Sequence, residues 1–397
     1  MKKCQVGPET IRMLELGHPW VIADRYTKKW PAGKAGELIA LVDDKQDHLA
    51  TALYDPKDRI IARVLDRGKI QLSEGWLKKK LLQAKQLRQH AQLVETDAYR
   101  WLNGEGDGLP GVTVDCYADY LMLQLYTPAW DAHLEPLIAS LQQVFQPKGI
   151  YRKLRPQETR ALEAKKRSKE YSRLIAGNPA PVPLQVKENG LNYLIDLREG
   201  LNTGLFPDQR RNRQELMTRV VGKRVLNLFA FTGAFSVAAA VAGAKKVTSV
   251  DVSAKYLEVA RENFSVNRIN PKRHEFIVSD VFTELARMQT QQRRFDVILF
   301  DPPSFSTTKK SRFSTHGGTS KLVIATLPLL ESGGLLVSSS NHQKVSMDDY
   351  MKELRRGSLQ SGNELKTIFT SGQPEDFPCS VSFPEGRYLK FVINVKQ

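Results

Sequence analysis

Residues 225–234 read VLNLFAFTGA, and this stretch decides the fold. An apolar run ends at Phe229, and Gly233 lets the backbone turn tightly before an alanine-rich helix. From residue 208 onward, helical patterns alternate with apolar strands, which is typical of a doubly wound α/β sheet. The expected strands cover residues 224–229, 246–251, 275–278, 295–300, 334–339, 367–370 and 388–395.

An aspartate closes three successive strands of this expected sheet: Asp251, Asp280 and Asp301. A single aspartate after a strand is often only the N-cap of the next helix. Sheets of this class bind ligands beyond the carboxyl ends of their strands. Three carboxylates there, together with the loop glycine, therefore predict a ligand site.

The glycine content of the first loop limits which classes of ligand the site can bind. The loop contains Gly233 but no G-x-G-x-x-G pattern, so it offers no close approach for a pyrophosphate, which argues against NAD and FAD. Asp251 ends the second strand, where a carboxylate can accept hydrogen bonds from both hydroxyls of a ribose. An adenosine without a pyrophosphate fits both observations.

Two smaller units are expected before this sheet. Short β-rich runs at 37–42 and 59–65 predict a β-barrel-like unit over residues 1–72. A helix over 77–93 and a hairpin over 112–125 predict a central α+β unit over 73–185. A hairpin around Asn189-Gly190 opens the third unit, residues 186–397.

The chain is strongly basic, with 59 Lys and Arg against 43 Asp and Glu, a net charge of +16 and a pI near 9.6. This balance favours a polyanionic partner such as RNA. Candidate RNA-binding residues are Arg210, Arg213, Lys309, Lys310 and Arg312.

Other bulk features narrow the class of protein. No apolar run is long enough to span a membrane and no signal peptide is evident, so a cytoplasmic protein without membrane contact is expected. The three cysteines lie far apart, with no spacing typical of a disulfide framework or a zinc site, so no metal is expected. A homodimer is left open.

The strand-end carboxylates resemble those of class I methyltransferases that use S-adenosylmethionine. The resemblance implies that Asp251 holds the ribose, Asp280 reaches the adenine amine, and the loop from Asp301 to Phe305 faces the target atom. The implied cofactor-binding residues are Gln209, Asn227, Phe229, Phe231, Thr232, Gly233, Asp251, Val252, Ser253, Asp280, Val281 and Asp301.

The flanking segments resemble the bacterial 23S ribosomal RNA large-subunit methyltransferase I family. The likeness rests on residues 18–20, 107–111, 202–210 and 383–390. It implies an N-terminal PUA RNA-binding domain, a central β-rich domain and a C-terminal Rossmann-like methyltransferase domain. Members of that family typically methylate carbon 5 of a cytosine in 23S rRNA.

The chain departs from that family at the catalytic cysteine. Carbon 5 of cytosine is a poor nucleophile, so such enzymes first attack carbon 6 with a thiolate. The family has its cysteine just after the fifth strand, where this chain has Ser339. Cys4, Cys116 and Cys379 lie elsewhere in the sequence. The loss favours a nitrogen target, guanine N7 or an exocyclic amine, with Phe305 as the stacking residue; both chemistries stay open.

The catalytic candidates are therefore Asp301, Pro302, Pro303, Phe305, Ser339 and Asn341. Two other classes of function remain open. One is an RNA-binding or ribosome-assembly protein that binds the cofactor with little turnover. The other is a small-molecule methyltransferase with a basic surface.

Overall fold

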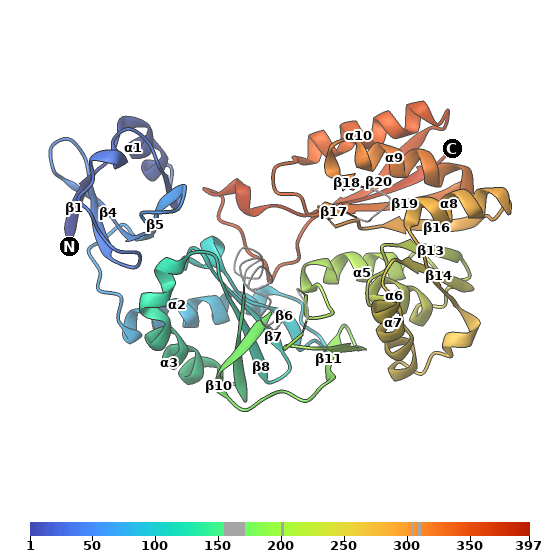
Figure 1. Ribbon diagram of the computed structural model, residues 1–397, viewed down its shortest axis with the longest axis horizontal. Coiled ribbons are helices and arrows are strands. Elements are labelled where there is room, and N and C mark those ends of the chain that lie inside the picture. Colours follow the sequence, from blue (N-terminus) through green and yellow to red (C-terminus); the bar gives the residue numbers. More distant parts are fainter. Residues whose placement is uncertain (155–170, 200–201, 304, 308–311) are drawn as a thin grey trace.

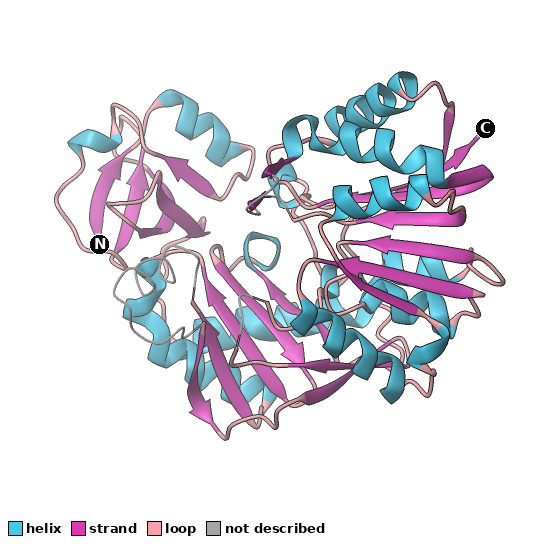
Figure 2. Cartoon of the chain, turned by 45° about the vertical axis from the view of Figure 1, so that its right-hand side comes forward, coloured by secondary structure: helices cyan, strands magenta, loops and turns pink. Residues whose placement is uncertain are grey.

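The protein is described by a computed structural model over residues 1–154, 171–199, 202–303, 305–307 and 312–397. Three units follow one another along the chain, each built around its own sheet (Figures 1 and 2). Residues 372–389, which we call the C-terminal segment, extend from the third unit toward the first two (Figure 1). The expected boundaries at residues 72 and 185 stay predictions.

The third unit contains a seven-stranded sheet in the order β15-β14-β13-β16-β19-β21-β20. All neighbouring pairs are parallel except those that β21 makes with β19 and β20. The order reverses between β13 and β16, which is the switch point where such sheets bind ligands. The strands are β13 Arg224–Leu228, β14 Lys246–Asp251, β15 Glu275–Val278, β16 Phe295–Phe300, β19 Leu330–Ser340, β20 Leu365–Ser371 and β21 Lys390–Lys396.

Helices cover both faces of this sheet (Figure 1). Apolar side chains of α5–α7 share one core with one face, and those of α8–α10 share another with the opposite face. The expectation of a Rossmann-like α/β unit is confirmed. The helices are α5 Arg210–Met217, α6 Ala234–Val241, α7 Ala254–Val266, α8 Val281–Thr290, α9 Thr315–Thr326 and α10 Met347–Gln360, and a small hairpin joins β17 Phe305–Thr307 to β18 Arg312–Ser314.

The N-terminal unit is a five-stranded sheet in the order β1-β3-β4-β5-β2, with one helix. The expected runs at 37–42 and 59–65 form β3 and β5, whereas the other three strands were not predicted. The elements are β1 Lys2–Gln5, α1 Pro8–Glu15, β2 Trp20–Ile22, β3 Leu38–Val42, β4 His48–Tyr54 and β5 Ile60–Asp66.

The central unit has a five-stranded sheet in the order β10-β9-β8-β7-β6, and two helices share its core. Its β7–β8 pair is the expected hairpin, while the expected helix over 77–93 ends earlier, at Leu87. The elements are α2 Glu74–Leu87, β6 Ala98–Asn103, β7 Val112–Tyr117, β8 Tyr120–Leu125, α3 Leu134–Phe145, β9 Gly149–Lys153 and β10 Ser172–Gly177.

A separate hairpin, β11 Leu184–Glu188 and β12 Leu191–Ile195, connects the central unit to the third. Asn189 and Gly190 both have positive φ, as the two-residue turn requires. Within the described residues, no helix has the length and apolar character needed to cross a bilayer.

Candidate active site

A cavity of about 300 Å³ opens at the carboxyl ends of β13, β14 and β16; we call it the inner cavity. Twelve of the residues expected in the site line it: Gln209, Asn227, Phe229, Phe231, Asp251, Val252, Asp280, Val281, Asp301, Pro302, Pro303 and Asn341. The sheet topology therefore brings together side chains that lie up to 132 positions apart in the sequence.

Asp251 holds the loop after β13 in place. One oxygen of its carboxylate accepts the backbone N–H of Phe231 at 2.9 Å, and the other accepts that of Ser253 at 2.9 Å. A carboxylate has about four acceptor positions, so both oxygens can still accept hydrogen bonds from a ligand in the cavity. Ser253 itself does not line the cavity; it caps α7 by accepting the N–H of Tyr256.

The loop between β13 and α6 has an unusual backbone. Phe229 and Phe231 have φ values of 57° and 51°, a conformation that side chains with a Cβ seldom adopt. Gly233 has φ of 76°, and a Cβ there would lie 2.8 Å from Cβ of Ala260 on α7. Thr232 is buried and donates to the carbonyl of Gly204 at 2.5 Å. Thr232 and Gly233 thus shape the cavity without lining it.

Asp280 lies at the start of α8, where it accepts the N–H of Thr283 at 3.1 Å. Its N-cap function and its position on the inner cavity are compatible, because the carboxylate can accept further hydrogen bonds. Val281 and Phe282 follow it on the cavity wall.

Asp301 lies in a network of hydrogen bonds at the end of β16. Nε2 of Gln209 donates to Asp301 Oδ2 at 3.0 Å and to Ser339 Oγ at 2.8 Å. Asn212 Nδ2 donates to Gln209 Oε1 at 2.6 Å, and Ser371 Oγ donates to Asn212 Oδ1 at 2.6 Å. This chain fixes the orientation of the Gln209 amide, so its NH2 group faces Asp301.

Burial raises the pKa of Asp301 to about 6, and the nearby carboxylate of Asp208 adds to the effect. Hydrogen bonds from Ser339 and Gln209 and the positive charge of Arg213 oppose the shift. The carboxyl group can therefore exchange a proton near neutral pH, as a general base must.

Sequence reasoning missed several residues of the inner cavity. Phe206 and Tyr256 both pack against Phe231, with ring centroids 5.4 and 4.5 Å from its centroid. Asp208 also lines the cavity and accepts the hydroxyl of Tyr388 at 2.7 Å. Phe206 and Asp208 lie within the segment 202–210 that carried the family likeness, so only that likeness could have indicated them.

The structure corrects the prediction that Arg210 and Arg213 bind RNA. Both side chains are buried: Arg210 pairs with Asp376 at 2.6 Å, and Arg213 pairs with Glu188 at 2.5 Å. Arg210 does not reach the surface, and Arg213 lines the inner cavity with its guanidinium engaged by Glu188, so neither is placed on an outer RNA-binding surface. The other three candidates, Lys309, Lys310 and the side chain of Arg312, lie outside the described residues, as does the side chain of Phe305.

Ser339 is 2% exposed and directs its hydroxyl toward Gln209 and Asp301. It does not line the inner cavity, whereas Asn341, two residues later, does. Cys4 and Cys116 are buried in the first two units, and Cys379 lies in a separate cavity. No thiol therefore lines the described wall of the inner cavity. In the described part of the chain, no three His, Cys, Asp or Glu side chains gather as a metal site requires.

The strand order, the single loop glycine and the three strand-end carboxylates define a class I methyltransferase. The sequence pattern of the S-adenosylmethionine-dependent methyltransferases matches residues 100–380, and that of the PUA-like domain matches residues 5–67. The chain belongs to the S-adenosylmethionine-dependent methyltransferases, within the family that includes ribosomal RNA large subunit methyltransferase I.

Individual relatives extend over nearly the whole chain. A Bacillus subtilis protein, YwbD, named as a ribosomal RNA large subunit methyltransferase, is 36% identical over 97% of both chains. Ribosomal RNA large subunit methyltransferase I of Yersinia pseudotuberculosis is 32% identical over 94% of both chains. Among solved structures, the methyltransferase SMU.776 in complex with S-adenosylhomocysteine has a TM-score of 0.89 and 30% identity over the full length of both chains.

The geometry at Asp251 gives a first testable prediction. We expect Asp251→Ala to weaken S-adenosylmethionine binding about 10- to 100-fold, because hydrogen bonds to a charged group contribute about 1.5–3 kcal/mol. Isothermal titration calorimetry measures the change. Asp43→Ala, an aspartate in the N-terminal unit far from the inner cavity in sequence and fold, is the control and should bind normally. Unchanged affinity in Asp251→Ala would refute the ribose assignment.

Proposed function

We propose that this chain transfers the methyl group of S-adenosylmethionine to a base nitrogen of 23S ribosomal RNA. The observation that carries the proposal is the half-buried residue Asp301, which lies beside Pro302, Pro303 and Asn341 in a cavity without a described thiol. The names of the relatives support ribosomal RNA of the large subunit as the substrate.

The residues of the inner cavity fit the cofactor. Asp251 and Asp280 offer acceptors for a ribose and an adenine amine, and Phe206, Phe231 and Tyr256 offer flat apolar surfaces. When bound, the cofactor supplies an activated methyl group on a sulfonium. We therefore infer that Asp251 and Asp280 orient the adenosine and that Asp301 faces the acceptor nitrogen.

The contribution of the protein is alignment and proton transfer. An exocyclic amine presents N–H groups that the Asp301 carboxylate and the Asn341 amide oxygen can accept. Accepting these hydrogens directs the nitrogen lone pair toward the methyl group, and alignment of this kind is the main source of rate in such a transfer. Asp301 then accepts the proton that the nitrogen loses. A guanine N7 would need only the alignment.

The experiment that tests this function is methyl transfer with analysis of the product. We expect labelled S-adenosylmethionine to methylate 23S rRNA from a strain that lacks the gene, and the product nucleoside to be a methylguanine or another N-methylated base by mass spectrometry. Detection of 5-methylcytosine would instead assign carbon 5 chemistry. If no form of the RNA accepts label while the cofactor binds, the chain is an RNA-binding or assembly protein.

A further inference from the structure

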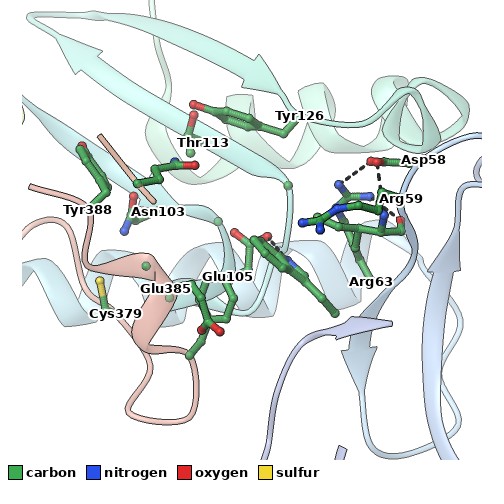
Figure 3. A pocket seen from close by; sticks show the side chains of 18 of the residues that line it. Asp58, Arg59, Arg63, Asn103, Glu105, Thr113, Tyr126, Cys379, Glu385 and Tyr388 are labelled. Carbon is green, nitrogen blue, oxygen red and sulfur yellow. Dashed lines mark hydrogen bonds and ion pairs between the residues drawn. The ribbon is translucent and has the colours of Figure 1, made fainter. Parts of the chain in front are cut away.

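A second and larger cavity, of about 740 Å³, lies where the three units meet; we call it the outer cavity (Figure 3). Trp20, Arg59 and Arg63 come from the N-terminal unit, and Tyr126 comes from the central unit. Tyr388 comes from the C-terminal segment. The cavity is thus built from all parts of the chain, and the activity proposed above does not account for it.

The cations of this cavity include three that are free to bind an anion. Lys57, Arg59 and Lys344 are exposed, and none of them forms an ion pair with the described residues. Four acidic side chains line the same cavity: Asp55, Asp58, Glu105 and Glu385. Asp58 pairs with Arg63 at 2.9 Å, and Glu105 accepts the indole N–H of Trp20 at 2.8 Å. Asp55 accepts the hydroxyl of Thr127, and Glu385 lies 3.6 Å from Nε2 of His18. The three exposed cations therefore remain without a carboxylate partner among the described residues.

The cavity wall also contains a buried hydrogen-bond donor that has no acceptor among the described residues. Arg63 is 3% exposed, and its Nε has no hydrogen-bond partner among the described residues. A buried donor without an acceptor lowers the stability of the folded protein. Its presence therefore indicates a position where a ligand can supply the missing acceptor. Gly111 has φ of 81°, and a Cβ there would lie 3.2 Å from this Nε. Glycine thus leaves the space beside Arg63 open.

Aromatic surfaces complete the outer cavity. The ring of Tyr126 is half-buried and lies across the cavity from the side chains of Arg59 and Glu105 (Figure 3). Trp20 packs against Phe383, with ring centroids 4.6 Å apart, which connects the N-terminal unit to the C-terminal segment. In proteins that bind single-stranded RNA, basic side chains contact the phosphates and aromatic rings stack on the bases.

Among the described residues, the outer and inner cavities have no lining residue in common, but neighbouring residues of the same segments line both. Tyr388 lines the outer cavity, and its hydroxyl donates at 2.7 Å to Asp208, which lines the inner cavity. The loop after β19 contributes Asn341 to the inner cavity and Gln343 and Lys344 to the outer one. This arrangement is the basis for assigning neighbouring nucleotides of one strand to the two cavities.

We propose that the outer cavity binds an unpaired nucleotide of the RNA substrate that neighbours the methylated base. Its phosphate contacts Lys57, Arg59 and Lys344, and its base lies against Tyr126. This inference rests on the proposed function, and it assigns to the meeting point of the three units the task of selecting which base enters the inner cavity.

The test is the double substitution Lys57→Ala/Arg59→Ala. Both side chains are exposed and form no ion pair within the described part of the chain, so the fold should be preserved. The probes are a fluorescein-labelled single-stranded RNA dodecamer and a 23S rRNA transcript. We expect RNA affinity to fall at least 10-fold at 0.1 M salt. The slope of log affinity against log salt should fall by about 1 to 1.5, since each phosphate contact to a single strand contributes about 0.7. KM for the transcript should rise while cofactor affinity stays unchanged.

Lys245→Ala is the matched control. Lys245 is exposed and lies just before β14, at the opposite end of the sheet from both cavities, so its loss should leave both RNA affinity and methyl transfer unchanged. Equal RNA affinity of the double variant and the control would overturn the outer-cavity proposal. Failure of the unsubstituted protein to methylate any RNA would overturn the proposed function alone, because the dodecamer still measures the outer cavity.

A second readout locates the nucleotide directly. RNA that contains 4-thiouridine, cross-linked by long-wavelength light, should attach to a peptide that contains Tyr126. Cross-links confined to peptides outside the outer cavity would contradict the proposal, whatever the change in affinity.

Discussion

Asp301→Asn should lower kcat for methyl transfer about 10²- to 10⁴-fold, the range that general acid–base groups contribute. The asparagine keeps the shape of the side chain, and its oxygen can still accept the N–H of Gln209, which donates at 3.0 Å in the native protein. Its NH2 group then faces the cavity. There it cannot accept the hydrogens of a substrate amine, nor can it take up a proton.

The pH dependence separates a catalytic group from a structural one. Burial and the charge of Asp208 raise the pKa of Asp301 to about 6, so the carboxylate is the main form above pH 6 and the protonated form below it. Because the base must be ionised to act, kcat should fall as the pH decreases through about 6, approaching a tenfold loss per pH unit. The residual activity of Asp301→Asn should not show this decrease in kcat at acidic pH.

The matched control lies on the same strand. Asp296 is near the start of β16, at the opposite end from the cavity, where it pairs with Arg224 at 3.0 Å. Asp296→Asn should keep the native kcat and pH profile. If Asp301→Asn retained full kcat and the same decrease at acidic pH, Asp301 would have no catalytic function.

The features of the fold that depend on local sequence could be predicted. All seven strands of the large sheet were expected, because apolar runs separated by helical patterns are visible without any long-range information. The positions of Asp251, Asp280 and Asp301 follow from the same reasoning, since the carboxyl ends of parallel strands meet at one edge of the sheet. Of the three unpredicted N-terminal strands, β1 and β2 are only four and three residues long, whereas β4 has seven residues and pairs with its neighbours in sequence, β3 and β5.

The surroundings of charged side chains could not be predicted. The composition of the arginine cluster at 210–213 does not reveal whether these side chains face solvent or are buried. Arg210 is buried because its partner, Asp376, lies 166 positions later, and Arg213 is buried because Glu188 lies on the neighbouring hairpin. Sequence separation of this kind leaves no periodic pattern, so the prediction of an RNA-binding surface there was wrong.

Asp376→Ala should lower the free energy of unfolding by about 3–5 kcal/mol, the cost of leaving one partner of a buried ion pair alone. Asp376 and Arg210 are both 0% exposed. The carboxylate of Asp376 also accepts the backbone N–H of Arg100 at 2.8 Å, and its carbonyl accepts Arg88 at 3.0 Å. This cluster attaches the C-terminal segment to the central unit, so its loss should also loosen the outer cavity.

Chemical denaturation measures this loss, and an exposed pair provides the comparison. Lys148 and Asp119 lie 2.7 Å apart with side chains 64% and 61% exposed, so Lys148→Ala should cost at most about 1 kcal/mol. If the penalty at Asp376 comes from the uncompensated charge of Arg210, replacing that arginine as well, in Asp376→Ala/Arg210→Met, should recover part of the stability. A double variant less stable than Asp376→Ala would instead show that the remaining contacts of Arg210, including its 2.9 Å hydrogen bond to the carbonyl of Gln92, contribute more than its charge costs.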